Sequence, residues 1–206
     1  MSEPTNFLDN AYELDSSDKT REYYRQWARS YDDELKANGY ASPARVAAAM
    51  AAHVADLTAP ILDLGCGTGL SGQALRDQGF TTIDGTDFSQ EMLAVAQSKD
   101  LYRATAKGDL NNPIPAAKGD YQNFAAVGVF SPGHAPPEMI PSVVDLLPQH
   151  GCLGFTLNDH ALEDARYETF ISDLAEAGTV EVALKEYGDH LPGIGLKATV
   201  YILRKL

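Results

Sequence analysis

Ile61-Leu-Asp-Leu-Gly-Cys-Gly-Thr-Gly69 is the stretch of sequence that decides the fold. Its first four residues are mostly aliphatic and predict a short buried strand, and glycine then alternates with other residues. A helical pattern follows over 70–78, with Gly79 as its expected end. Strand, glycine turn and helix start together predict a nucleotide-type site. Glycine lets the backbone approach a ligand closely, and the helix start offers free N–H groups.

Two acidic residues near this turn narrow the choice of ligand. The spacing G-x-G-x-G departs from the dinucleotide pattern G-x-G-x-x-G, because Leu70 stands where the third glycine would be. Asp63, two residues before Gly65, would repel a pyrophosphate and attract an ammonium group. Asp87 lies 22 residues after Gly65, a distance that suits the hydroxyls of a ribose. S-adenosylmethionine (SAM) carries an ammonium and a sulfonium but no phosphate, so it fits this pattern best.

Both motifs resemble those of class I SAM-dependent methyltransferases. Asp63-Leu-Gly-Cys-Gly-Thr-Gly69 is similar to the first motif of that family, and Gly85-Thr-Asp-Phe-Ser-Gln-Glu-Met-Leu93 to the acidic site that follows. Within the class, a Trp-Ala…Tyr-Asp helix, a Gly-His…Pro-Pro loop and a terminal Tyr-x-x-x-Arg-Lys strand resemble the methyltransferase-like proteins of the Williams–Beuren region type. The resemblance covers 24–206. It implies an α/β fold with a Rossmann-like, doubly wound, seven-stranded and mostly parallel sheet, an antiparallel last strand and N-terminal helices.

The resemblance also implies cofactor contacts beyond the two motifs. Phe88 and Met92 would lie beside the ribose and adenine, Asp109 would bind the exocyclic amine, and the Leu110 N–H would meet a ring nitrogen. Backbone carbonyls near Val127 would accept the methionine ammonium. An N-terminal helix covers the cofactor in many relatives, although an aromatic stripe at helical spacing is equally suited to a core. The expected cofactor-binding residues are Tyr31, Asp63, Gly65, Cys66, Gly67, Asp87, Phe88, Met92, Asp109, Leu110 and Val127.

Methyl transfer is an in-line displacement on a sulfonium carbon, so positioning the nucleophile in a dry pocket supplies much of the rate. An oxygen or protonated nitrogen nucleophile also needs a base. His134 and His160 are the candidates, because each follows a predicted central strand on the ligand side of the sheet; a loop histidine is otherwise a common surface residue. Asn158, Asp159 and His160 offer ligand atoms for magnesium, but a sufficient spread of ligands is not evident, so no metal is expected.

The remaining pattern predicts a single domain. A flexible N-terminus is expected over 1–16 and one methyltransferase domain over 17–206, made of a helical lid (17–56) and a Rossmann-like core (57–206). Helices are predicted over 17–37 and 163–177, another from Ser42 as its cap, with Pro43 at the first helical position, and another with Ser89 as its cap. Strands are predicted over 81–86, 101–107, 124–130, 152–157, 180–187 and 197–204, and a loop over 188–195.

Composition limits the partners. The net charge of −13 disfavours a nucleic-acid substrate, since phosphate backbones would repel the chain. No apolar run approaches a membrane span, and the polar first ten residues are unlike a secretory signal, so neither a membrane nor export is expected. Two cysteines are expected to be thiols, which is typical of a cytoplasmic protein. The oligomeric state stays open.

These features predict a SAM-dependent methyltransferase that methylates an unidentified small molecule and releases S-adenosylhomocysteine (SAH). Two alternatives remain. One is a regulatory module that binds SAM or SAH without catalysis, because intact cofactor motifs fit it equally well. The other is an NAD-dependent oxidoreductase, which would bind NAD in place of SAM.

Overall fold

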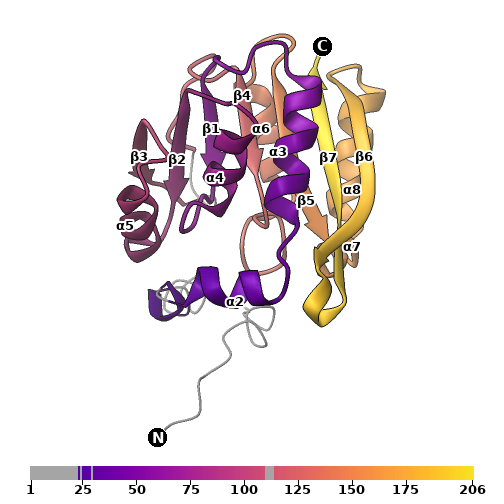
Figure 1. Ribbon diagram of the computed structural model, residues 1–206. Coiled ribbons are helices and arrows are strands. Elements are labelled where there is room, and N and C mark those ends of the chain that lie inside the picture. The colour runs from indigo at the N-terminus through magenta and orange to yellow at the C-terminus, as the bar shows by residue number, and fades with distance from the viewer. Residues whose placement is uncertain (1–22, 24, 29, 110–113) are drawn as a thin grey trace, which may run out of the picture.

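A seven-stranded sheet forms the centre of the molecule (Figure 1). A computed structural model of the chain describes residues 23, 25–28, 30–109 and 114–206. The strand order is β3-β2-β1-β4-β5-β7-β6. The bounds are β1 Ile61–Leu64, β2 Ile83–Asp87, β3 Ala104–Lys107, β4 Asn123–Ala126, β5 Cys152–Asn158, β6 Val180–Leu191 and β7 Leu196–Lys205. Strands β1 to β5 pair in parallel, and β7 pairs antiparallel with both β5 and β6. This arrangement confirms the predicted fold class.

Helices cover both faces of the sheet (Figure 1). They are α2 Tyr31–Ala37, α3 Ser42–His53, α4 Leu70–Asp77, α5 Gln90–Ser98, α6 Met139–Leu146, α7 Asp159–Leu162 and α8 Arg166–Glu176, with a 3-10 turn at Pro192–Ile194. Because side chains alternate along a strand, β1 serves two cores. Ile61 packs with α3 and α4 on one face, and Leu62 and Leu64 pack with α6 and α8 on the other. Among the described residues, no helix is long and apolar enough to cross a membrane.

The order of the strands places a ligand site at one end of the sheet. Strand β1 pairs with β2 on one side and with β4 on the other, so the winding direction reverses between β1 and β4. In doubly wound sheets ligands bind outside the carboxyl ends of the strands at this switch point. Helix α2 lies across those carboxyl ends (Figure 1). The fold therefore puts the glycine-rich turn and the N-terminal helix on the same side.

The prediction of one continuous helix over 17–37 was wrong within the described part of the chain. Helical residues reach Trp27, a turn follows, and α2 begins at Tyr31. The N–H of Ser30 bonds to the Trp27 carbonyl at 3.0 Å, which closes the turn, and the Ser30 hydroxyl donates to Glu34 at 2.5 Å. Residues 17–22 lie outside the described residues. Ser30, a residue type common at helix caps, thus marks a break in the helix that the spacing of the apolar residues does not reveal.

Ser42 was also wrongly predicted as a helix cap. Ala41 occupies the N-cap of α3 and Ser42 is the first helical residue, so Pro43 is the second, one position later than predicted. The Ser42 hydroxyl lies 2.7 Å from Nδ1 of His190, 148 residues away in the sequence. The Ser42 hydroxyl therefore makes a tertiary contact, although the local sequence predicts that it caps the helix. By contrast, Ser89 caps α5 as predicted, accepting the Met92 N–H at 3.2 Å.

Three further boundaries differ from prediction. Strand β4 ends at Ala126 and not at residue 130, because Gly128 has a φ of +70° and its N–H donates to Thr156. The first half of the predicted loop 188–195 is strand, and the Arg45 guanidinium binds carbonyls of both β6 and β7 there. The predicted helix 163–177 begins at Arg166, after the separate short α7.

Candidate cofactor site

The glycine turn between β1 and α4 has a backbone that only glycine adopts readily. Gly65, Gly67 and Gly69 have φ angles of +64°, +53° and +95°. A Cβ on Gly65 would also lie 2.6 Å from a methyl carbon of Val129. The turn is anchored to the neighbouring strand, because the Cys66 N–H donates to the Thr86 carbonyl at 2.9 Å. The sequence pattern thus produces the close-approach backbone that was predicted.

Asp87, at the end of β2, joins the two sequence motifs. Its Oδ2 accepts the Gly67 N–H at 2.9 Å, and its Oδ1 accepts the Ser89 N–H at 2.8 Å. The side chain is buried, and this burial raises the pKa of Asp87 to about 6 against the lowering effect of the backbone N–H groups of Ser89, Gly67 and Phe88. A carboxylate offers about four lone-pair sites, so Asp87 keeps acceptor capacity for a ligand hydroxyl.

Asp63 is completely buried at the end of β1. Its Oδ2 accepts the hydroxyls of Ser71 at 2.6 Å and Tyr102 at 2.7 Å. Its Oδ1 is buried and has no hydrogen-bond partner among the described residues. Burial raises the pKa of Asp63 to about 7, partly offset by the hydrogen bonds from Ser71 and Tyr102. The site therefore contains a carboxylate whose negative charge the protein itself only partly stabilises.

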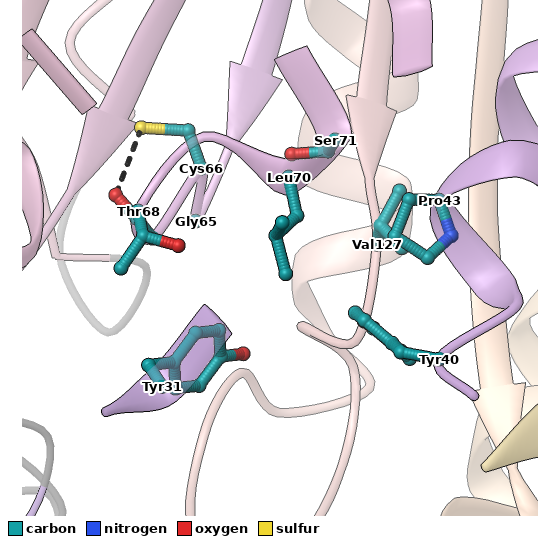
Figure 2. A pocket seen from close by; sticks show the side chains of 10 residues that line it. Tyr31, Tyr40, Pro43, Gly65, Cys66, Thr68, Leu70, Ser71 and Val127 are labelled. Carbon is teal, nitrogen blue, oxygen red and sulfur yellow. Dashed lines mark hydrogen bonds between the residues drawn. The ribbon is translucent and has the colours of Figure 1, made fainter. Parts of the chain in front are cut away.

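A pocket opens beside the glycine turn (Figure 2). Its volume is about 260 Å³, including the space at its mouth. The pocket is lined by Tyr31, Tyr40, Pro43, Gly65, Cys66, Gly67, Thr68, Leu70, Ser71 and Val127. Figure 2 shows the two tyrosines facing the glycine turn from the opposite side of the pocket. The N-terminal helices thus contribute one wall, and the ends of β1 and β4 contribute the other.

The predicted cofactor residues separate into two groups. Tyr31, Gly65, Cys66, Gly67 and Val127 line the pocket. The others are Asp63, Asp87, Phe88, Met92 and Asp109, which do not line it, and Leu110, which lies outside the described residues. Asp109 follows Gly108, whose N–H donates to the Asp87 carbonyl at 2.9 Å. Asp87 at the end of β2 and Asp109 just after β3 therefore lie at neighbouring strand ends.

Five further residues line the pocket and were not predicted from the sequence: Tyr40, Pro43, Thr68, Leu70 and Ser71. Thr68, Leu70 and Ser71 belong to the quoted stretch or follow it directly, so their position after a binding turn was a usable signal. Tyr40 comes from the segment between α2 and α3 and Pro43 from the first turn of α3, and only the tertiary fold brings both to the pocket.

Asp32 ties α2 to the cofactor side of the sheet. The Thr68 hydroxyl donates to Asp32 Oδ1, and Lys99, just beyond α5, approaches Asp32 Oδ2; both distances are 2.5 Å. Leu35 and Trp27 add apolar contacts with Leu191 of β6. One carboxylate thus holds the N-terminal helix to the glycine turn and to the helix that follows Asp87.

The two candidate base residues lie away from the pocket lining. His134 is half-buried, and its Nδ1 lies 3.1 Å from the Ser131 hydroxyl and 3.3 Å from the Pro132 carbonyl. Burial lowers the pKa of His134 more than the Pro132 hydrogen bond raises it, so the ring is neutral near pH 7. His160 is exposed on α7, 3.8 Å from Glu163. The described residues contain no group of three or more metal-ligating side chains placed to hold an ion.

Comparison with known proteins agrees with this geometry. Residues 61–151, which run from β1 almost to β5, match the family model described as a methyltransferase domain. In this segment and in the order of its strands the chain is similar to class I SAM-dependent methyltransferases. The chain is also 34% identical over 125 residues to methyltransferase-like protein 27 of Homo sapiens, covering 59% of this chain and 51% of that protein. This similarity agrees with the finer resemblance to methyltransferase-like proteins.

Other relatives match shorter segments. The 18S rRNA (guanine(1575)-N(7))-methyltransferase of Saccharomyces cerevisiae is 38% identical over 69 residues, which is 34% of this chain and 24% of that protein. The chain therefore spans about half of the human relative and about a quarter of the yeast relative. Among solved structures, magnesium protoporphyrin IX methyltransferase from Synechocystis PCC 6803 with bound SAM has a TM-score of 0.66 and 17% identity, with 100% of both chains covered. At that identity the match supports the fold alone.

We expect Asp63→Asn to stabilise the ligand-free protein at pH 8. Because the pKa of Asp63 is raised to about 7 in the folded state, the carboxyl favours folding below its unfolded pKa of 3.8 and loses this effect as the pH rises through 7. An amide has no charge to desolvate. The gain over wild type is at most about 4 kcal/mol at pH 8, at about 1.4 kcal/mol per pKa unit. Urea unfolding at pH 5 and pH 8 measures it.

Asp84→Asn is the matched control with the opposite sign. Arg103 and Tyr121 donate hydrogen bonds to Asp84, and their effect exceeds that of burial, so the pKa of Asp84 is lowered. This variant should be less stable than wild type at pH 8. A pH-independent effect of Asp63→Asn would contradict the burial of a charged Asp63.

Proposed function

We propose that this chain is a SAM-dependent methyltransferase that transfers the methyl group of SAM to a small molecule and releases SAH. The observation that carries the proposal is Asp87, whose carboxylate accepts the N–H groups of Gly67 and of Ser89, the cap of α5, while keeping acceptor capacity for a ribose. This contact joins both motifs of the resemblance at the carboxyl ends of β1 and β2. The unpaired Oδ1 of Asp63 adds a negative group suited to a cationic ligand.

The charge of the chain supports a small-molecule acceptor over RNA. Two relatives, from yeast and from Bos taurus, are named as 18S rRNA methyltransferases. RNA binding depends on basic side chains that neutralise phosphates, and this chain has a net charge of −13. A small acceptor would instead enter beside Tyr40 and Val127, where the pocket meets the end of β4. His134 and His160 stay candidates for the base, since each follows a central strand at this end of the sheet.

Two assays test the function. In calorimetric titrations we expect micromolar binding of SAM and SAH and no heat with NAD. Incubation with methyl-labelled SAM and a library of amines, phenols, carboxylic acids and 18S rRNA should label a small acceptor. Binding of NAD in place of SAM would overturn the proposal in favour of an oxidoreductase. SAM binding without any labelled product would favour a regulatory module, and labelled RNA would identify a nucleic-acid acceptor.

Asp87→Ala should weaken SAM binding tenfold to a hundredfold, because the ribose hydroxyls lose their acceptor and the Gly67 and Ser89 N–H groups lose theirs. This corresponds to about 1–3 kcal/mol, the usual cost of stripping hydrogen bonds from a buried polar group. Calorimetry measures the affinity. Asp77→Ala, at an exposed position at the end of α4, is the control and should bind normally. Unchanged affinity in Asp87→Ala would place the ribose elsewhere.

We further propose a single domain over 17–206 in which residues 17–56 form the lid and α2 is the part that moves. The pocket encloses a cavity volume of only about 20 Å³ while α2 is in this position, far below the usual range for small-molecule sites, about 300–1,000 Å³. SAM would therefore enter as α2 moves outward. Among the described residues, the contacts that hold α2 against the glycine turn are those of side chains, chiefly Asp32 and the apolar residues near it.

Asp32→Ala should release SAH faster than wild type, because Thr68 and Lys99 both lose their contact with the lid. The ion pair is partly exposed, so we expect roughly a two- to fivefold increase in the dissociation rate, measured by stopped-flow fluorescence of Trp27. Asp33→Ala changes the neighbouring exposed carboxylate on the same helix and should leave the rate unchanged. Equal rates in all three proteins would remove the lid role.

A further inference from the structure

Ser71 connects the pocket to the buried carboxylate of Asp63. It is the second residue of α4, it lines the pocket, and its side chain is mostly buried. Its hydroxyl donates to Asp63 Oδ2 at 2.6 Å. Figure 2 shows Ser71 beside the glycine turn and above Leu70. Asp63 itself does not line the pocket. A ligand in the pocket therefore meets the Ser71 oxygen first and the carboxylate only behind it.

Tyr102 makes a second hydrogen bond to the same carboxylate. Its hydroxyl donates to Asp63 Oδ2 at 2.7 Å. A Cβ on Gly72 would lie 2.3 Å from the Tyr102 hydroxyl oxygen, and a Cβ on Gly85 would lie 3.0 Å from its ring. The ring therefore occupies space that two glycines leave open, one on α4 and one on β2. This packing fixes the hydroxyl of Tyr102 against Asp63.

We propose that the Ser71 hydroxyl oxygen accepts a hydrogen bond from the ammonium group of bound SAM or SAH, and that Asp63 and Tyr102 hold it in that orientation. A serine hydroxyl has one hydrogen and two lone pairs. The hydrogen is used by Asp63, so lone pairs remain for the pocket, and an ammonium group is purely a donor. The proposal rests on the proposed function and deepens it. Asp63 becomes a positioning residue that acts through Ser71, and not a direct contact.

The electrostatics around Asp63 support a cationic ligand. The groups that face it are Asp87 at the end of β2, the Cys66 thiol in the glycine turn and the Tyr102 phenol. Burial raises the pKa of both Cys66 and Tyr102, so neither is charged near pH 7. Asp87 is the other charged group, and it is negative. An ammonium held at Ser71 would supply the positive charge that these neighbours lack.

The orientation of Ser71 depends on the protonation of Asp63. The ionised carboxylate can only accept, so Ser71 must donate to it. A protonated Asp63 can donate to Ser71 instead, which turns the serine hydrogen toward the pocket, where it repels an ammonium. With a pKa of Asp63 raised to about 7 by burial, affinity for an ammonium ligand should fall as the pH drops below 7. Loss of the Tyr102 donor should move this fall to higher pH.

Two ligands separate this role from a general effect on folding. SAH carries the ammonium, and 5′-methylthioadenosine has the same adenosine without the amino-acid end. We expect Ser71→Ala to weaken SAH binding about tenfold, the scale of one hydrogen bond to a charged group, and to leave 5′-methylthioadenosine unchanged. Ser71→Thr keeps the hydroxyl and should restore SAH binding. Calorimetry at pH 8 measures both ligands, and their ratio is independent of the folded fraction.

Tyr102→Phe adds a readout that packing alone would not change. The ratio of SAH to 5′-methylthioadenosine affinity, measured from pH 5.5 to 8.5, should begin to fall at a higher pH than in wild type. Effects of Asp87 on ribose binding are common to both ligands and cancel in the ratio.

Equal losses for both ligands in Ser71→Ala, or no loss for SAH, would overturn the role of Ser71 while leaving the proposed function intact. An unshifted pH profile in Tyr102→Phe would remove Tyr102 from it. A wild-type protein that binds neither ligand would overturn the proposed function, and this inference with it.

Discussion

The hydrogen bond from the Gly67 N–H to the Asp87 carboxylate is the contact on which the rest of the site depends. It fixes the glycine turn against the end of β2, two segments separated by 20 residues. The second oxygen of the same carboxylate binds the Ser89 N–H, next to the cap of α5. A single buried side chain therefore sets both the shape of the turn and the starting point of the next helix. Any ligand bound there meets backbone that is already ordered.

Burial of two carboxylates at neighbouring strand ends has an energetic cost. Burial raises the pKa of Asp63 to about 7 and that of Asp87 to about 6, so both are less stable as charges than in water. Backbone N–H groups stabilise Asp87, whereas Asp63 relies on two neutral hydroxyls and keeps one oxygen without a partner among the described residues. Burial of these two charges lowers the stability of the free protein, and the same charges would attract a cation. The same carboxylates would repel a phosphate.

The sequence predicted those parts of the structure whose signals are local. The strand, glycine turn and α4 follow from residues adjacent in the chain, and the Ser89 cap from a pattern of four residues. The network of Asp63, Ser71 and Tyr102 could not be predicted, because Tyr102 is 39 residues from Asp63 and is an ordinary aromatic residue of the predicted strand 101–107. A contact of Asp63 with a ligand was expected from its place in the motif. In the structure Ser71 lines the pocket and donates to Asp63, which does not line it.

The segment between α2 and α3 connects the proposed lid helix to the hairpin of β6 and β7. The Ala41 N–H donates to the His190 carbonyl at 2.9 Å, the Gly193 N–H donates to the Asn38 carbonyl at 3.0 Å, and the Ser42 hydroxyl lies 2.7 Å from the His190 ring. Backbone hydrogen bonds of this kind hold more firmly than exposed side-chain ion pairs. The segment is therefore fixed to the hairpin of β6 and β7, while the contacts of α2 with the glycine turn among the described residues are made by side chains. If α2 moves as proposed, it would pivot about this segment. Because Tyr40 lies within the segment, that tyrosine would stay in the pocket wall when Tyr31 moves away with the helix.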